Sequence, residues 1–255
     1  GEMVGETAER GAREWDISRQ AQDQMSIESH RRAIASKTEI QKEISPLAIP
    51  PHMDQYISED IGPRESIDPD KVARMKPYFD RKMGTVTVAN SCGITDGAAM
   101  VLVMRESRAK ALGYEPLARI VSSAFVGCDP LRMGLGPVHA MARLLNSSGL
   151  EVQDPQCVEL NEAFAAQVLA CQEALASPSY SRDAGFKKTP GAIPEDRLNP
   201  EGGSIALGHP VGASGARIVL SCARKLHQAG GGHGIATMCI GGGQGGAVLL
   251  EGISS

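Results

Sequence analysis

Residues 234–251 read Gly-Ile-Ala-Thr-Met-Cys-Ile-Gly-Gly-Gly-Gln-Gly-Gly-Ala-Val-Leu-Leu-Glu. Two apolar runs of strand length, 234–238 and 246–251, flank a turn made largely of glycine. The link between the runs is too short for a crossover connection. The stretch therefore predicts an antiparallel pair of strands.

Upstream of this pair, strand and helix patterns alternate from Leu117 onward. The spacing predicts strands over 118–124 and 156–160, and helices over 137–148, 163–175 and 213–228. A polar loop with proline and glycine is predicted over 177–200. Alternation of this type predicts an α/β fold with helices covering a sheet.

The first third of the chain has a different character. Residues 6–42 are charged and helix-prone, with Ile17, Ala21, Met25 and Ala33 on a four-residue step. Prolines recur from 46 to 77, so regular structure is expected to be sparse there. A strand is predicted over 84–89, a buried strand over 98–104, and a short helix over 106–112.

Composition narrows the class of protein. The chain has 255 residues, 42% of them hydrophobic, and a net charge of −4, so nucleic acid and anionic membranes are unexpected as main partners. No apolar run approaches membrane-spanning length. The six cysteines form no Cys-x-x-Cys pair and no metal-type spacing with the six histidines, which predicts a reducing compartment and no metal site.

Asn161-Glu162-Ala163-Phe164 lies where a predicted strand gives way to a helix. At such a point a side chain projects from the edge of the sheet toward a cleft. Asn161 can hold a water or a thioester oxygen there. The alternative is a helix N-cap, because asparagine is among the preferred capping residues.

Gly208-His209-Pro210 lies between two glycine-rich segments and precedes a predicted helix. The proline restricts the backbone after the histidine, and the positive end of the helix favours a thiolate or an enolate oxygen nearby. His209 is therefore a candidate acid or base. A tight loop with a merely hydrogen-bonded histidine is the alternative.

Cys239 precedes the glycine turn 241–243. A thiol beside exposed backbone N–H groups can reach a lowered pKa and exchange protons near neutrality. The alternative is a buried structural cysteine before a glycine hairpin. A base, an acid and backbone donors together suit chemistry at the carbon next to a thioester.

In the segments around Asn161, His209 and Cys239, the chain resembles the thiolases, the acyl-CoA acetyltransferase family. Gly5–Glu9, Ile17–Asp23 and Ser29-His30 are similar to the opening of the family's loop domain. Gly84–Ala99 is similar to the strand returning to its first core domain, and 199–217 to its catalytic C-terminal half. The resemblance implies the layered α-β-α-β-α thiolase fold, with a loop domain over 1–84, the final segment of the N-terminal core domain over 85–115, and the C-terminal domain over 116–255.

The resemblance also implies roles for the site residues. His209 would activate a nucleophilic cysteine and share an oxyanion hole with Asn161, which acts through a water. Cys239 would exchange the α-proton of acetyl-CoA, and the Gly241 N–H would serve a second oxyanion hole. Ser91 and Cys92 would lie by the pantetheine. The reaction is reversible cleavage of 3-ketoacyl-CoA by coenzyme A, or Claisen condensation of acetyl-CoA, in fatty acid metabolism. It would use the CoA thioester as substrate, with no cofactor or metal.

Two departures from the family pattern matter. Cys92 stands where many members carry serine, and the nucleophile stretch Asn-x-x-Cys-x-Ser-Gly does not occur. We therefore expect the nucleophile on a missing N-terminal part or a second chain, leaving this chain alone inactive. A homo- or hetero-oligomer is expected, in the cytoplasm or an organelle matrix. The alternatives are a non-catalytic acyl-CoA or lipid-binding protein and a structural subunit. Acyl chain length and reaction direction are not determined by these motifs.

Overall fold

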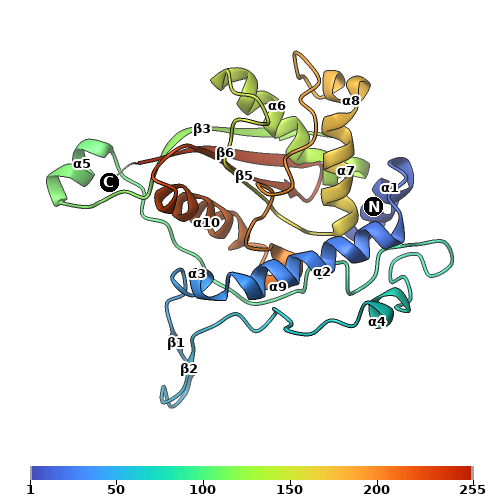
Figure 1. Cartoon of the computed structure of the whole chain (residues 1–255), viewed down its shortest axis with the longest axis horizontal. Coiled ribbons are helices and arrows are strands. Elements are labelled where there is room, and N and C mark those ends of the chain that lie inside the picture. Colours follow the sequence, from blue (N-terminus) through green and yellow to red (C-terminus); the bar gives the residue numbers. More distant parts are fainter. Residues whose placement is uncertain (1, 254–255) are drawn as a thin grey trace.

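The computed structural model describes residues 2–253, which are built around a four-stranded mixed sheet (Figure 1). The strands are β3 (Ala118–Gly127), β4 (Cys157–Leu160), β5 (His233–Ile240) and β6 (Gln244–Gly252), in the order β3-β6-β5-β4. β4 runs parallel to β5, and the β3–β6 and β5–β6 pairs are antiparallel. The predicted antiparallel pair at the turn 241–243 is confirmed.

Helices cover both faces of the sheet, which confirms the α/β class. One face carries α6 (Gly136–Ser148) and α7 (Ala165–Ala176), and the other carries α10 (Ser214–Gln228) (Figure 1). The helices predicted at 137–148, 163–175 and 213–228 thus form within two residues of their predicted starts. Gly149 ends α6 with a φ of 76°, a left-handed conformation that glycine adopts without strain.

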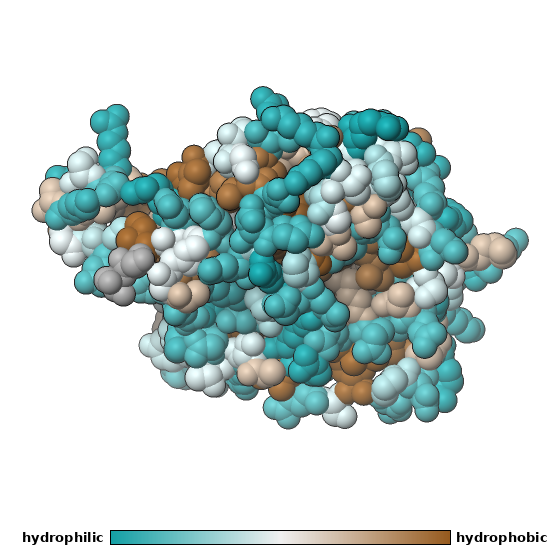
Figure 2. Space-filling view, turned by 45° about the horizontal axis from the view of Figure 1, so that its top comes forward, coloured by the Kyte–Doolittle hydropathy of each residue, from teal (hydrophilic) through white to brown (hydrophobic). Residues whose placement is uncertain are grey.

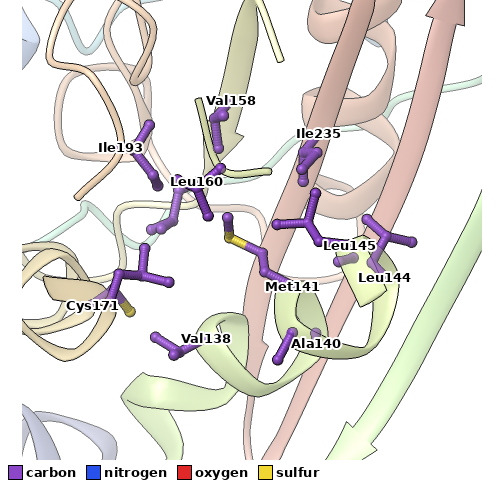
Figure 3. Close-up of a cluster of buried hydrophobic side chains, with 14 of the residues drawn as sticks. Val138, Ala140, Met141, Leu144, Leu145, Val158, Leu160, Cys171, Ile193 and Ile235 are labelled. Atoms are coloured by element: carbon purple, nitrogen blue, oxygen red, sulfur yellow. The ribbon is translucent and has the colours of Figure 1, made fainter. Parts of the chain in front are cut away.

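The larger core lies between the sheet and α6–α7. In Figure 3, Met141 of α6 points toward Leu160 of β4, with Cys171 of α7 and Ile235 of β5 around them. All four side chains are at most 1% exposed. Burial of such side chains stabilises a fold by about 1.5–3 kcal/mol each, so this layer anchors β4 and β5.

The helix-prone stretch 6–42 is helical as predicted, and it is divided into three helices. They are α1 (Val4–Glu14), α2 (Arg19–Ala35) and α3 (Lys37–Gln41). Asp16 has a φ of 51°, which interrupts the helical path, and the Ser18 hydroxyl then caps α2 by accepting from the Ala21 N–H at 3.1 Å. The turn at Asp16 therefore separates α1 from α2.

The predicted four-residue step explains only part of the buried face of α2, on which Met25 packs against the larger core and Ala33 is buried. The buried side chains of α2 are mainly polar: Gln22, Asp23, Ser26, Ser29 and His30, with Ala33 as the apolar exception. Met25 is only partly buried. This face is polar because it holds loops by hydrogen bonds, as described for the site below.

The strand predicted over 84–89 does not form in the described structure. Instead, the backbone N–H groups of Thr85 and Val86 donate to the buried Glu9 carboxylate at 2.9 Å. A strand needs a neighbour for its backbone groups, and here a side chain from α1 takes that place.

The predicted burial of 98–104 is wrong as well. Residues 98–103 form no helix or strand, and Met100, Leu102 and Val103 are 88%, 75% and 64% exposed. On β3, Phe125 is 66% exposed. Figure 2 shows apolar atoms at the surface where the outlying α5 segment (Glu106–Leu112) joins the body of the molecule. Apolar surface of this extent is typical of a face that another element covers.

Shorter elements complete the described chain. They are β1 (Leu47–Ala48), β2 (Tyr56–Ile57), α4 (Pro69–Ala73), the 3₁₀ helix η1 (Pro130–Leu135), α8 (Pro178–Asp183) and α9 (Ser204–Leu207). The predicted loop 177–200 therefore contains a short helix, which Ser177 caps by accepting from the Tyr180 N–H. Across residues 2–253, no helix combines the length and the apolar character needed to cross a bilayer.

Candidate active site

The structure brings Asn161 and His209 together at the end of the sheet. Asn161 directly follows β4, and its backbone N–H donates to Thr237 O of β5 at 3.0 Å. Its side-chain Nδ2 lies 3.5 Å from Nε2 of His209, at the outer limit of a hydrogen bond. Two residues 48 positions apart thus face each other across a short gap.

The other ring nitrogen of His209 is held by the first turn of α10. Nδ1 lies 2.6 Å from Ser214 Oγ, and that hydroxyl donates to the carbonyl of Pro210 at 3.2 Å. Both contacts are hydrogen bonds when the Ser214 hydroxyl donates to Pro210 and accepts from His209, so this arrangement favours a proton on Nδ1. Nε2 then carries a lone pair toward Asn161.

Electrostatics keep His209 neutral. Burial lowers the pKa of the imidazole below its usual 6.5, and the nearby Arg217 guanidinium lowers it further. A neutral imidazole with a free lone pair is a competent general base near pH 7.

The loop that carries His209 packs closely against residues 93–95. Gly208 has a φ of 92°, and a Cβ placed there would lie 2.5 Å from Thr95 Oγ1. The His209 N–H also donates to Gly93 O at 3.0 Å. The loop is therefore packed against 93–95, and a side chain at position 208 would displace it.

The loop 90–93 lies between the His209 loop and the segment that follows Asn161. On one side this loop binds His209 through Gly93. On the other, the Cys92 N–H donates to Ala163 O at 3.1 Å. α2 holds the loop in place, because Asn90 Nδ2 donates to Asp23 Oδ1 at 2.9 Å. The polar buried face of α2 is thus explained by the loop that it supports.

The two predicted substrate contacts on this loop differ in availability. The Ser91 hydroxyl donates to Thr87 O at 2.6 Å and is engaged within the loop. Cys92 is partly exposed, and burial raises the pKa of its thiol to about 11. Their contact with a pantetheine remains a prediction.

Cys239 lies near the end of β5, in the apolar cluster on the α7 side of the sheet with Ala163 and Phe164. Burial, with the neighbouring Cys92 and Cys128, raises the pKa of the Cys239 thiol to about 12. The expected lowering of this pKa is wrong, because apolar side chains surround the thiol. Among the described residues, no hydrogen bond joins Cys239 to Asn161 or His209.

The turn after Cys239 presents a backbone donor. Gly241 is exposed, and within residues 2–253 its N–H donates no hydrogen bond. Gly243 has a φ of 90°, and a Cβ there would lie 2.6 Å from Cys128 O. Glycine is required at 243, whereas at 241 the structure leaves an N–H free for an incoming oxygen.

Sequence reasoning missed the residues that hold Asn161. Ser204 Oγ donates to Asn161 Oδ1 at 2.6 Å, and Asn199 pairs both backbone groups of Leu160 at 2.8 Å. Asn161 is therefore no helix cap; the N-cap position of α7 is Phe164. The sequence offered only Ser204 after two glycines and Asn199 before a proline as signals for these residues, and neither pattern is specific for a site.

Glu162 was also missed as a structural centre of the site. Its buried carboxylate accepts from Ser29 Oγ at 2.6 Å, Asn199 Nδ2 at 2.9 Å and the Ile205 N–H at 3.2 Å. Burial still raises its pKa above the usual 4.5. Glu162 ties α2, residue 199 and α9 to the segment that carries Asn161.

Comparison with known proteins gives matches over nearly the whole chain. Residues 1–107 match the model of the thiolase N-terminal domain, and residues 114–252 match that of the thiolase C-terminal domain. The 3-ketoacyl-CoA thiolase of Shewanella loihica is 41% identical over 257 residues. That alignment covers 98% of this chain but only 58% of the Shewanella protein.

Two solved structures are similar in fold. The dimeric peroxisomal thiolase of Saccharomyces cerevisiae superposes with a TM-score of 0.86 at 35% identity, covering 100% of this chain and 60% of that one. Human mitochondrial 3-ketoacyl-CoA thiolase in complex with CoA gives 0.85 at 35% identity, covering 98% and 58%. The chain thus spans about three fifths of the length of the proteins it matches.

Proposed function

Because the chain belongs to the thiolase family, we propose that it forms part of an acyl-CoA acetyltransferase acting on 3-ketoacyl-CoA. The reaction is thiolytic cleavage by coenzyme A, or Claisen condensation of acetyl-CoA in reverse. The observation that carries the proposal is the state of His209. Its neutral imidazole presents the Nε2 lone pair beside Asn161 Nδ2, at 3.5 Å.

The nucleophile of this reaction is a cysteine outside residues 1–255. His209 takes the thiol proton on Nε2, and the thiolate attacks the 3-keto carbon of the substrate. The oxyanion that forms is stabilised through Asn161 and a water, as polar donors stabilise developing charge. The bond between C2 and C3 then breaks, which leaves an acyl group on sulfur and a carbanion on acetyl-CoA.

Cys239 supplies the proton for that carbanion. Its pKa of about 12 keeps the thiol protonated at neutral pH, so it begins the cleavage direction as an acid. The exposed Gly241 N–H stabilises the enolate oxygen beside it. Coenzyme A then attacks the acyl-enzyme as its thiol proton passes to the Cys239 thiolate. Acyl-CoA leaves, and the nucleophilic cysteine takes its proton back from His209. In the condensation direction, Cys239 first has to lose its proton.

The exposed apolar residues support a missing partner for this chain. Met100, Leu102 and Val103 lie beyond the loop 90–93 with 64–88% exposure. The matched thiolases are longer by about two fifths of their length. A segment that carries the nucleophile and packs over 98–103 would bury this surface and bring its thiol to His209. The segment is either part of a longer chain or a separate one.

Reconstitution tests the proposal. The purified chain is mixed with the separately expressed part of the Shewanella loihica thiolase that precedes the matched region. Thiolysis is then followed as the CoA-dependent loss of 3-ketoacyl-CoA. Turnover is expected in the mixture and in neither component alone. His209→Ala and Cys239→Ala are expected to abolish it, whereas Cys128→Ala, a partly exposed cysteine, retains it.

Full activity of the lone chain would refute an external nucleophile. Binding of CoA esters by calorimetry, without turnover in any reconstituted mixture, would instead support a non-catalytic acyl-CoA-binding protein. Undiminished turnover of Cys239→Ala would exclude its role as the acid.

Assembly and compartment follow as further parts of the proposal. The yeast neighbour is dimeric and the human neighbour binds CoA, so we propose CoA binding and a homo- or hetero-oligomer for this chain. Those neighbours are peroxisomal and mitochondrial, which supports an organelle matrix beside the cytoplasm as the compartment. Native mass spectrometry of the purified material measures the assembly directly.

A further inference from the structure

Arg217 lies behind the Asn161–His209 pair, in the first turns of α10. Its Nη2 donates to Ser204 Oγ at 3.3 Å, and Ser204 in turn donates to Asn161 Oδ1 at 2.6 Å. The Nε of Arg217 is buried and has no hydrogen-bond partner among the described residues. The guanidinium is thus directed at Ser204 without being held in an ion pair of its own within residues 2–253.

The direction of the hydrogen bonds from Arg217 through Ser204 to Asn161 determines which way the Asn161 amide faces. A guanidinium can only donate, so Ser204 Oγ accepts from Arg217, and its single proton is left to donate to Asn161. The oxygen of the Asn161 amide must then face Ser204, which turns Nδ2 toward His209. An Nδ2 donor requires a lone pair on Nε2 of His209, the tautomer that Ser214 also favours.

We propose that Arg217 is a positioning residue, which sets the orientation of the Asn161 amide through Ser204 and thereby the tautomer of His209. The consequence for catalysis rests on the proposed thiolase function. Without Arg217, Ser204 can also accept from the Asn161 amide, which then turns its oxygen toward His209. That arrangement favours a proton on Nε2 and removes the lone pair that takes the nucleophile's proton.

Arg217 also acts on His209 through its charge. The other ionisable groups on the elements around His209 are Cys92 and Asp96 on the loop that it contacts, and Glu162 beside Asn161. Asp60 interacts with Arg217 rather than with His209. Loss of the guanidinium therefore removes the cationic neighbour that disfavours the imidazolium, and the pKa of His209 is expected to rise.

Nuclear magnetic resonance of the ¹⁵N-histidine-labelled chain tests the tautomer directly. Long-range ¹H–¹⁵N spectra distinguish a protonated from an unprotonated ring nitrogen, and His209→Asn assigns the signal. Wild type is expected to show an unprotonated Nε2. Arg217→Met and Ser204→Ala are each expected to shift the tautomer ratio about tenfold toward protonated Nε2, equivalent to about 1.4 kcal/mol.

Two further variants separate positioning from general damage. Arg217→Lys keeps a donor and a charge and is expected to preserve most of the wild-type ratio. Arg182→Met removes an exposed arginine on α8 and is expected to change nothing. A native ratio in Arg217→Met would overturn the proposal, and so would a native ratio in Ser204→Ala, because the effect of Arg217 passes through that hydroxyl. If Arg217→Met does not fold, a native ratio in Ser204→Ala is still sufficient to overturn it.

The turnover of the reconstituted enzyme gives a second readout. Arg217→Met is expected to lower kcat about tenfold with KM within twofold of wild type. An absence of turnover in the unsubstituted mixture would refute the thiolase function but leave the spectroscopic test of Arg217 intact. The two ideas can therefore fail separately.

Discussion

Replacing Asn199 with alanine tests how the Asn161 segment is held at the edge of the sheet. Asn199 Oδ1 accepts from the Leu160 N–H, and Nδ2 donates to Leu160 O, both at 2.8 Å. Nδ2 also donates to Glu162 at 2.9 Å. At Leu160 this side chain thus supplies the hydrogen bonds that a neighbouring strand would give, next to Val158, whose backbone pairs with residues 197 and 199.

The expected cost follows from these contacts. Asn199→Ala leaves two buried backbone groups of Leu160 without partners, at about 1–3 kcal/mol each. Asn199 has a φ of 43°, where asparagine is tolerated better than alanine, which adds about 1 kcal/mol. We expect a loss of about 4 kcal/mol in the free energy of unfolding. In a chain of 255 residues this loss lowers the midpoint temperature of thermal unfolding by about 8–16 °C.

Urea and thermal unfolding, followed by far-ultraviolet circular dichroism, measure this loss. Asn199→Gly removes the same side chain but accepts the positive φ, so it is expected to lose about 1 kcal/mol less. Asn146→Ala is the matched control, because its amide donates to Gly185 O at 2.7 Å in an exposed position. It is expected to cost about 0.5 kcal/mol. An Asn199→Ala loss no larger than that of the control would refute the reasoning.

Three further predictions follow from the site. Ser214→Ala removes the partner of His209 Nδ1 and is expected to lower kcat of the reconstituted enzyme at least tenfold; unchanged kinetics would contradict its role. Since burial and Arg217 lower the pKa of His209 below its usual 6.5, the acid limb of the thiolysis pH–rate profile should have its midpoint below pH 6.5, where His209 becomes protonated; a midpoint above pH 6.5 would argue against a neutral base. Gly243→Ala places a Cβ 2.6 Å from Cys128 O and should destabilise the chain by about 2–4 kcal/mol in urea unfolding, whereas Gly113→Ala, in open space at a φ of 70°, should cost about 1 kcal/mol.

The order of elements from β3 to β6 could be predicted from local pattern. Apolar runs, helical spacing and glycine stops are properties of neighbouring residues, and they placed the four strands and the longer helices α6, α7 and α10 within a few residues, but not the short helices η1, α8 and α9. The same reasoning was wrong over 84–104. A strand there depends on a neighbouring strand, which residues 2–253 do not provide, and no local signal reports on a neighbour.

For the candidate site, the sequence by itself determined which residue types stand at the ends of elements: Asn161 after β4, His209 before α10 and Cys239 near the end of β5. Only the tertiary structure decided their states. His209 has its tautomer and lowered pKa from Ser214 and Arg217, and Cys239 has its raised pKa from apolar burial. The reason is physical: chain pattern governs the backbone, but a proton's position depends on the dielectric and the hydrogen-bond partners that folding brings from distant parts of the sequence.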